Sequence, residues 1–303
     1  MASDDPFEGS SFNDETLPVL RPRNLSRSLP RPPSFEVAGR SDVGLVREQN
    51  EDTFLIAELG RWLEVKDTSL PVPDAVRRNA VPQGTLLMVA DGMGGHGGGE
   101  VASAVAVDTI AQFALTAMPW VVQPDDEAER QILTKLGDAM SQCQQRLQAV
   151  ALRKNMQEMK MGTTLTIAYV LWPKLYVAHA GDSRLYLHRD GELVQITRDH
   201  TVGQALRDSG AIGAGPSRFD HILVNVVGGG TDHVKAEAHS LSLVRGDRIL
   251  LCSDGLTGHV SDATIGHELA DAEKKAAAIC EKLIEDAKAG GGLDNITVVV
   301  ASF

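Results

Sequence analysis

Residues 174–197 read KLYVAHAGDSRLYLHRDGELVQIT and show how the strands of this chain are connected. It holds three short runs of strand length, 174–178, 184–188 and 193–197, which together are rich in Leu, Val and Tyr. The last two runs are separated by Arg189-Asp190-Gly191-Glu192. Because Asp-Gly accepts positive φ angles, this tetrapeptide predicts a β-hairpin turn. Two strands joined so closely pair antiparallel.

The chain beyond residue 35 continues in the same way, with short apolar strands and a few long amphipathic helices. Further strands are expected at 52–59, 85–90, 163–170, 233–241, 247–252 and 295–301, and helices at 99–118, 126–154, 201–209 and 273–289. A parallel sheet would need a helix between most strands, and the pattern lacks these helices. The sequence therefore predicts an α+β fold in which antiparallel sheets are covered by helices.

The charge and the cysteines narrow the class of protein. The chain carries 29 basic and 41 acidic residues, a net charge of −12 at pH 7, which argues against binding to nucleic acid or to an anionic membrane. No apolar run has the length of a membrane span, and residues 1–15 lack the features of a signal peptide. The three cysteines form no CxxC pair, which fits free thiols in a reducing compartment. We expect a cytoplasmic protein.

Residues 1–35 differ in composition from the rest and contain six of the 13 prolines. Acids gather in the first half of this segment and arginines in the second. It has too little apolar surface to offset the entropy lost on ordering, so we expect a disordered tail, followed by one domain over 36–303. The tail is either a solvated linker or a docking or phosphorylation segment around Ser26 and Ser28, and its sequence does not separate the two.

Acidic residues recur where the expected strands begin or end. They are Glu51 and Asp52 at the start of one strand, Asp91, Asp182 and Asp254 after three others, and Asp294 before the last. A single acid beside a glycine is ordinarily a turn or cap residue, but the repetition forms a pattern. If these ends meet, two carboxylates ~4 Å apart repel by about 4 kcal/mol at an effective dielectric near 20. Such a cluster requires cations.

Oxygen ligands alone favour a hard cation, Mg²⁺ or Mn²⁺, over zinc. Two such ions about 3.5–4 Å apart can clamp a phosphoryl group and activate a water molecule for attack. The acids therefore point to metal-assisted hydrolysis of a phosphate ester, without a covalent enzyme intermediate.

Seven short motifs extend this observation over residues 41–297. In order they are SDVGLVREQNED (41–52), DGMGGH (91–96), MGTT (161–164), GDSR (181–184), TRDHT (197–201), SDGL (253–256) and DNIT (294–297). With these motifs in this order, the chain resembles the metal-dependent protein phosphatase family, PP2C or PPM, in its bacterial form. The resemblance implies an αββα sandwich, two packed antiparallel β-sheets flanked by α-helices.

The resemblance also implies two core metal ions, Mn²⁺ or Mg²⁺, and a possible third. Asp91, Asp254 and Asp294 match the family's ligands to one core ion. Glu51, Asp91 and the Gly92 carbonyl match the ligands to the other, so that Asp91 would bridge the two.

Other matched residues would complete the site. Asp182, together with Asp254, corresponds to ligands of the weaker third ion. Asp52 corresponds to an acid that hydrogen-bonds metal-bound water. Arg47 corresponds to the arginine that grips the substrate phosphate, for which a guanidinium fork is suited.

The proton donor to the leaving group is less clear, since Met93 stands where some relatives have a histidine. His96 is the candidate general acid, with a helix-start or supporting role as the alternative. His200 is expected to order the loop beneath it. Residues 202–230 are rich in glycine and correspond to the family's mobile flap, but they lack the arginine that the family often has near Asn225.

The resemblance thus implies hydrolysis of phosphoserine and phosphothreonine in proteins, opposing a bacterial Ser/Thr kinase, by a cytoplasmic monomer. One alternative is a pseudophosphatase that binds phosphoproteins without turnover, although such proteins usually lose a metal-binding acid. Another is a phosphatase with a dedicated regulatory partner, such as an anti-sigma-factor antagonist.

Overall fold

The stretch 174–197 forms three strands, β8 (Lys174–Ala180), β9 (Arg184–Arg189) and β10 (Glu192–Gln195), which belong to two different sheets. The β9–β10 hairpin turns at Asp190 and Gly191, whose φ angles of 52° and 84° are those of the predicted Asp-Gly turn. The short segment between β8 and β9, which carries Asp182, therefore crosses from one sheet to the other.

This description rests on a computed structural model, which describes residues 35–60, 62–64, 77–79, 84–95, 97–118, 126–153 and 160–303. The described residues all belong to one compact unit. The predicted disorder of the N-terminal tail falls almost wholly outside the described residues.

Each of the two main sheets is antiparallel throughout. One has the order β11-β6-β5-β7-β8-β12, with β2 also paired to β5; its strands are β2 (Asp52–Leu59), β5 (Gly84–Met93), β6 (Gly162–Thr163), β7 (Leu165–Leu171), β8, β11 (Val227–Gly228) and β12 (Glu237–Ser242). The other has the order β1-β14-β13-β9-β10, with β1 (Glu36–Asp42), β13 (Arg248–Cys252) and β14 (Ile296–Ser302). A separate pair joins β3 (Trp62–Glu64) and β4 (Arg77–Asn79).

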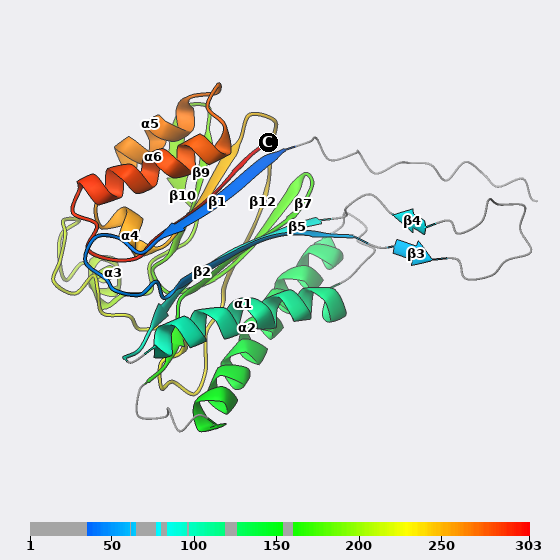
Figure 1. The fold of residues 1–303 in the computed structure, drawn as a ribbon, viewed down its shortest axis with the longest axis horizontal. Coiled ribbons are helices and arrows are strands. Elements are labelled where there is room, and N and C mark those ends of the chain that lie inside the picture. The colour runs from blue at the N-terminus through cyan, green and yellow to red at the C-terminus, as the bar shows by residue number, and fades with distance from the viewer. Residues whose placement is uncertain are drawn as a thin grey trace, which may run out of the picture. The chain divides into compact units, whose positions relative to one another are not determined.

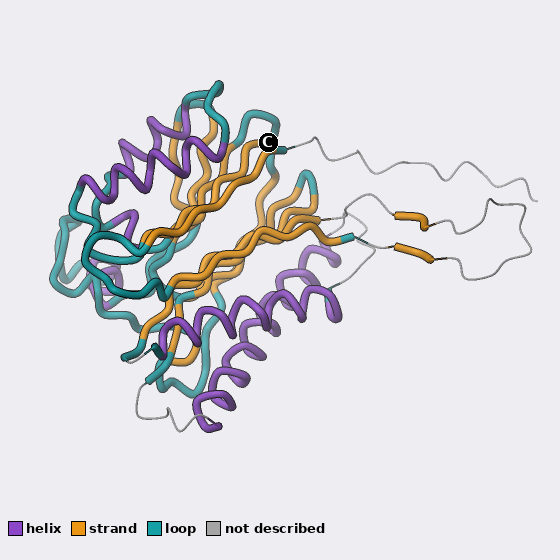
Figure 2. The backbone as a smooth tube through the Cα atoms, in the orientation of Figure 1, coloured by secondary structure: helices purple, strands orange, loops and turns teal. Residues whose placement is uncertain are grey.

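Helices cover the outer face of each sheet (Figure 1). The seven-stranded sheet carries α1 (Gly98–Ala117) and α2 (Asp126–Arg153), and the five-stranded sheet carries α4 (Asp254–Thr257), α5 (Asp262–Ala270) and α6 (Ala276–Ala289). The short α3 (Val202–Asp208) opens the glycine-rich segment. Figure 2 shows the strands of the two sheets lying between these helical layers. The predicted sandwich of two antiparallel sheets between helices is confirmed.

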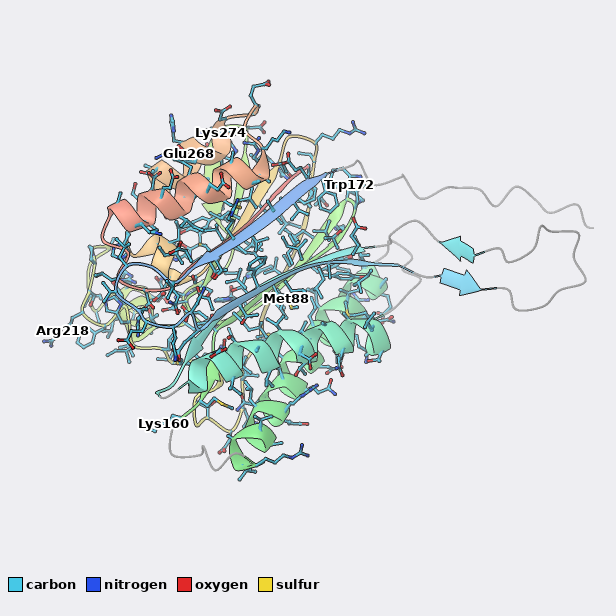
Figure 3. The ribbon with its side chains drawn as sticks, in the orientation of Figure 1. Met88, Lys160, Trp172, Arg218, Glu268 and Lys274 are labelled. Atoms are coloured by element: carbon cyan, nitrogen blue, oxygen red, sulfur yellow. The ribbon has the colours of Figure 1, made fainter. Side chains whose placement is uncertain are left out.

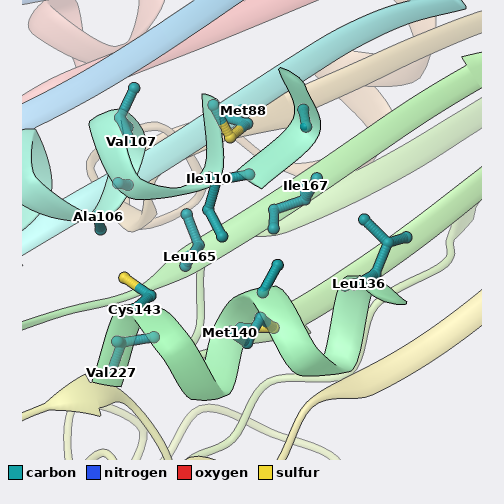
Figure 4. Packing of buried hydrophobic residues seen from close by; sticks show 14 of the residues in the cluster. Met88, Ala106, Val107, Ile110, Leu136, Met140, Cys143, Leu165, Ile167 and Val227 are labelled. Carbon is teal, nitrogen blue, oxygen red and sulfur yellow. The ribbon is translucent and has the colours of Figure 1, made fainter. Parts of the chain in front are cut away.

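Strand β5 explains why this sandwich needs continuous apolar runs. Met88 points to the helical side, where it packs with Ile110 of α1 and Met140 of α2 (Figure 3 and Figure 4). Leu87 and Val89, one residue to either side, lie in the core between the two sheets. Both faces of the strand are buried, so alternation of apolar and polar residues is lost.

Helix α1 has the length and composition that a membrane span requires. The expectation that no apolar run is this long is therefore wrong by this measure. In the structure the helix buries Ala102, Ala106 and Ile110 in the core that it shares with β5 and α2. This is the arrangement of a core helix.

Candidate metal centre

Asp52 and Asp91 face each other across the β2–β5 pair, at the end of its ladder. Glu51 precedes β2, and its carbonyl accepts a hydrogen bond from the Gly92 N–H at 3.2 Å. The expected end of the strand before Asp91 is wrong, because β5 continues to Met93 by pairing its last two residues with β6. Three predicted metal ligands and Asp52 thus share one edge of the seven-stranded sheet.

Asp254 and Asp294 come from the other sheet, just after β13 and just before β14. Ser253 fastens the two sheets together at this point. Its hydroxyl donates to Asp52 Oδ2 at 2.7 Å and accepts a hydrogen bond from the Thr297 N–H at 3.0 Å. The acids of both sheets therefore meet.

Asn295 holds the loop between β1 and β2 against the start of β14. Its Oδ1 accepts the Glu51 N–H at 2.8 Å, and its Nδ2 donates to the carbonyls of Val43 and Gln49 at 3.0 and 2.9 Å. Ser253 and Asn295 belong to the motifs SDGL and DNIT, but the sequence did not indicate that they join the two sheets.

The acids lie close enough to shift one another's pKa. Burial, with the charge of Asp254 adding to it, raises the pKa of Asp52 to about 7 and that of Asp182 to about 8. Burial also holds the pKa of Asp91 well above its usual range, and the charges of Asp52, Asp254 and Asp182 act in the same direction. The pKa of Asp254 is raised by burial and then by Asp294. Asp182 therefore belongs to the same cluster as the four other aspartates.

Two buried oxygens of this cluster, Asp52 Oδ1 and Asp254 Oδ1, have no hydrogen-bond partner in the part of the chain that the structure describes. An unpaired buried acceptor of this kind costs about 1–3 kcal/mol, and a cation would satisfy it. All predicted donors are oxygens, so the site fits Mn²⁺ or Mg²⁺. Among the described residues, no three His, Cys, Asp or Glu side chains already surround one point at coordinating distance. Binding of an ion therefore requires side-chain adjustment.

Asp294, one of the predicted metal ligands, is paired with Arg47. Arg47 Nη2 donates to Asp294 Oδ2 at 2.7 Å, with the two side chains 52% and 38% exposed. The charges of Glu51 and Asp91 also act on this guanidinium. A half-exposed ion pair contributes little to stability. Asp294 can therefore be released to a cation at small cost, and the guanidinium is then free to hold an anion.

Glu51 is held at the start of α1. Burial raises the pKa of its carboxyl, while hydrogen bonds from the backbone N–H groups of Gly99 and Glu100 lower it. A Cβ added at Gly99 would lie 2.6 Å from the carboxyl carbon of Glu51. Only glycine leaves room for the carboxylate here.

We expect Gly99→Ala to weaken Mn²⁺ binding about tenfold, the lower end of what loss of a ligand-orienting contact costs, because the methyl group displaces Glu51. Isothermal titration calorimetry with Mn²⁺ measures this. Gly137→Ala is the matched control, since a Cβ at that position in α2 meets nothing within 4 Å. Equal affinity in the two variants would contradict this role of Gly99.

Thr164 connects Asp91 to the segment that carries Asp182. Its N–H donates to the Asp91 carbonyl at 2.8 Å, and its Oγ1 accepts the Asp91 N–H at 3.0 Å. The same hydroxyl lies 2.7 Å from Ser183 Oγ. The threonines of the 161–164 motif therefore set the position of the central acid.

His96 lies outside the described residues, so its assignment as general acid stays a prediction. The glycine-rich segment 202–230 begins with α3, which Thr201 caps by accepting the Gln204 N–H at 3.1 Å. Whether this segment moves as the family's flap does also stays a prediction.

Comparisons with known proteins agree with the fold and with the acid cluster described above. A family profile described as protein phosphatase 2C matches residues 66–287. The serine/threonine protein phosphatase PstP of Mycobacterium tuberculosis is 37% identical over 266 residues, which are 87% of this chain and 44% of PstP. The chain therefore spans less than half the length of that relative. The serine/threonine phosphatase stp of Listeria welshimeri is 30% identical over 267 residues, 86% of this chain and 93% of that protein.

A solved structure of the catalytic domain of PstP, in complex with two manganese ions, superposes with a TM-score of 0.67 at 35% identity. The match covers 88% of this chain and 97% of that one.

Proposed function

Since the chain belongs to the protein phosphatase 2C family, we propose that it is a metal-dependent phosphatase acting on phosphoserine and phosphothreonine in proteins. The observation that carries the proposal is the cluster of acids that both sheets contribute, with two unpaired carboxylate oxygens beside an exposed arginine. Listeria stp, of which the chain covers 93%, and the longer PstP are both named serine/threonine phosphatases.

We assign the metal ligands within this cluster. Asp91, Asp254 and Asp294 would hold one core ion, and Glu51, Asp91 and the Gly92 carbonyl the other. Asp182 would bind a third ion together with Asp254. Bound Mn²⁺ or Mg²⁺ supplies positive charge for the phosphoryl oxygens and lowers the pKa of a water molecule.

The remaining roles belong to the chain itself. Arg47, once released from Asp294, would orient the substrate phosphate with its guanidinium fork. Asp52 Oδ1, which faces no donor among the described residues, would accept a hydrogen bond from the attacking water and so orient it. His96 would return a proton to the leaving alkoxide.

The proposal predicts that the purified protein releases phosphate from a phosphothreonine peptide when Mn²⁺ is present. Exhaustive chelation should stop the release, because it removes the ions that would supply positive charge to the phosphoryl oxygens. A protein that binds the peptide without turnover, with all its metal acids in place, would favour the pseudophosphatase alternative. The family match and the complete acid set support the enzyme.

Arg47→Lys should raise KM for a phosphopeptide about tenfold while lowering kcat less, because an ammonium group cannot grip two phosphate oxygens at once. Steady-state kinetics at saturating Mn²⁺ separates the two constants. Arg40→Lys is the control, since Arg40 pairs with Glu281 on the outer side of β1. An unchanged KM in Arg47→Lys would remove Arg47 from the phosphate site.

We further propose a cognate bacterial Ser/Thr kinase as the source of substrates, and a cytoplasmic, monomeric enzyme. The net charge of −12 supports partners other than nucleic acid. Phosphoproteome comparison of cells with and without the active protein would identify its substrates.

A further inference from the structure

We propose that His200 is a positioning residue, which links the glycine-rich segment 202–230 to the Gly181–Asp182 turn, so that movement of this segment displaces Asp182. The inference rests on the proposed function only where it treats Asp182 as a metal ligand. The link itself follows from the hydrogen bonds of one residue.

His200 holds both polar groups of Gly181. Its backbone N–H donates to the Gly181 carbonyl at 2.7 Å, and its ring Nδ1 accepts the Gly181 N–H at 3.2 Å. Gly181 has a φ of 121°, and a Cβ there would lie 2.5 Å from Thr164. This backbone conformation is available only to glycine. Because glycine is conformationally free, the position of Gly181 depends on hydrogen bonds from other residues, here His200.

The same histidine holds the glycine-rich segment. Its carbonyl accepts the Val224 N–H at 2.9 Å, and Asn225 Nδ2 donates to Nδ1 at 2.9 Å. The orientation of the Asn225 amide is fixed by Lys235, whose N–H donates to Oδ1 at 3.0 Å and whose carbonyl accepts from Nδ2 at 2.7 Å. Nδ1 of His200 is therefore shared between this segment and Gly181.

The ring of His200 has one orientation that satisfies all its neighbours. Nδ1 faces two N–H donors and must be an acceptor, so Nε2 carries the proton, which it donates to Glu237 Oε2 at 3.1 Å. Glu237 opens β12 and also accepts the Arg198 N–H at 3.1 Å. Burial would raise the pKa of this carboxyl, but hydrogen bonds from His200 and His239 lower it to about 2. A permanent carboxylate thus keeps the ring in place.

His179 supports the ring from below. The two imidazoles stack with centroids 4.9 Å apart, and His179 Nε2 faces the carbonyls of Gly181 and Arg198 at 3.0 and 3.1 Å. Both carbonyls only accept, so Nε2 carries the proton and Nδ1 accepts from Thr166 at 2.9 Å. Burial lowers the pKa of His179 to about 4 and keeps it neutral. The His200 ring cannot shift without disturbing Gly181.

A substitution in the glycine-rich segment should therefore alter the hydrogen bonding of the Gly181 amide. We expect Asn225→Leu, measured by NMR amide exchange without added metal, to speed exchange of the Gly181 N–H about fivefold to tenfold, the effect of losing one hydrogen bond. Among the described residues Asn225 has no hydrogen bond to Gly181, whereas His200 Nδ1 accepts one from each of them. Faster exchange at Val224 with an unchanged Gly181 amide would overturn the inference.

Arg218→Gln is the control within the same segment. Arg218 is exposed, its guanidinium lies over Phe219, and it points away at the periphery of the molecule (Figure 3). This variant should leave the Gly181 amide as in the wild type. If both substitutions speeded exchange of the Gly181 amide equally, the cause would be a general destabilisation of the segment. That result would also overturn the specific link through His200.

Two substitutions of His200 separate its bonds. His200→Asn retains an acceptor near Nδ1, whereas His200→Leu removes it. We expect Leu to raise the Mn²⁺ concentration for half-maximal activity about tenfold, and Asn to restore most of the loss. Equal effects of Leu and Asn would overturn the positioning role. Inactive wild-type protein would instead refute the proposed function, while the amide-exchange test would still stand.

Discussion

Replacement of Asp91 by asparagine should lower kcat/KM for a phosphothreonine peptide by on the order of a thousandfold, the effect of losing one charge contact in the transition state. Asp91 is the acid assigned to both core ions, and an amide removes the negative charge that the pair shares. The backbone of residue 91 keeps its hydrogen bonds to Thr164. The variant should therefore fold.

The thermal stability of the Asp91→Asn variant should change in the opposite direction to its activity. Burial and the charges of neighbouring acids disfavour ionised Asp91. Without divalent cations, Asp91→Asn should therefore unfold at a higher temperature than the wild type at pH 8, although it is inactive. Asp108→Asn is the control, because Asp108 forms an exposed pair with Arg146 on the helical layer. Retained activity, or a lower melting temperature without metal, would contradict the assignment.

In the presence of a chelator, we expect the wild-type protein to lose stability as the pH rises from 5 to 8. The pKa of Asp52 is raised from 3.8 to about 7 and that of Asp182 from 3.8 to about 8, chiefly by burial. In this range the folded protein holds protons that the unfolded chain has released. The stability that these acids contribute is thus fully present below about pH 4 and is lost as the pH rises through 7 to 8.

Mn²⁺ should reverse this loss. At 100 times its Kd, an ion that binds only the folded state adds about 2.7 kcal/mol, which raises the melting temperature by about 5–10 °C in a protein of this size. The gain should be larger at pH 8 than at pH 5, since protons compete for the same oxygens. Differential scanning calorimetry measures both effects. The pH slope in chelator should flatten in Asp52→Asn; an unchanged slope, or no response to Mn²⁺, would refute the explanation.

Local patterns were sufficient to predict much of the fold. The Asp190-Gly191 turn forms with both φ angles positive, and the long apolar runs form strands. The strand β1 was not predicted, because EVAGRSD has few apolar residues and gains its order from pairing with β14, more than 250 residues away in sequence. Helix α5 was missed because nine residues give too little periodicity.

The candidate site, too, could be predicted only in part from the sequence. Acids at strand ends could be read from the sequence, and the structure brings Asp52, Asp91, Asp182, Asp254 and Asp294 within electrostatic reach of one another. The sequence could not predict the ion pair between Arg47 and Asp294 or the hydrogen bond from Ser253 to Asp52. Both depend on how the ends of two sheets meet, which no local pattern describes.

The pairing of β1 with β14 has a practical consequence for engineering. Asp42 lies opposite Ile296 beside the acids, whereas Glu36 lies opposite Ser302 at the other end of the ladder, where Phe35 stacks on Phe303. A reporter fused after Phe303 would start about 20 Å, one strand length, from the acids. At that distance we expect it to leave the proposed metal site accessible.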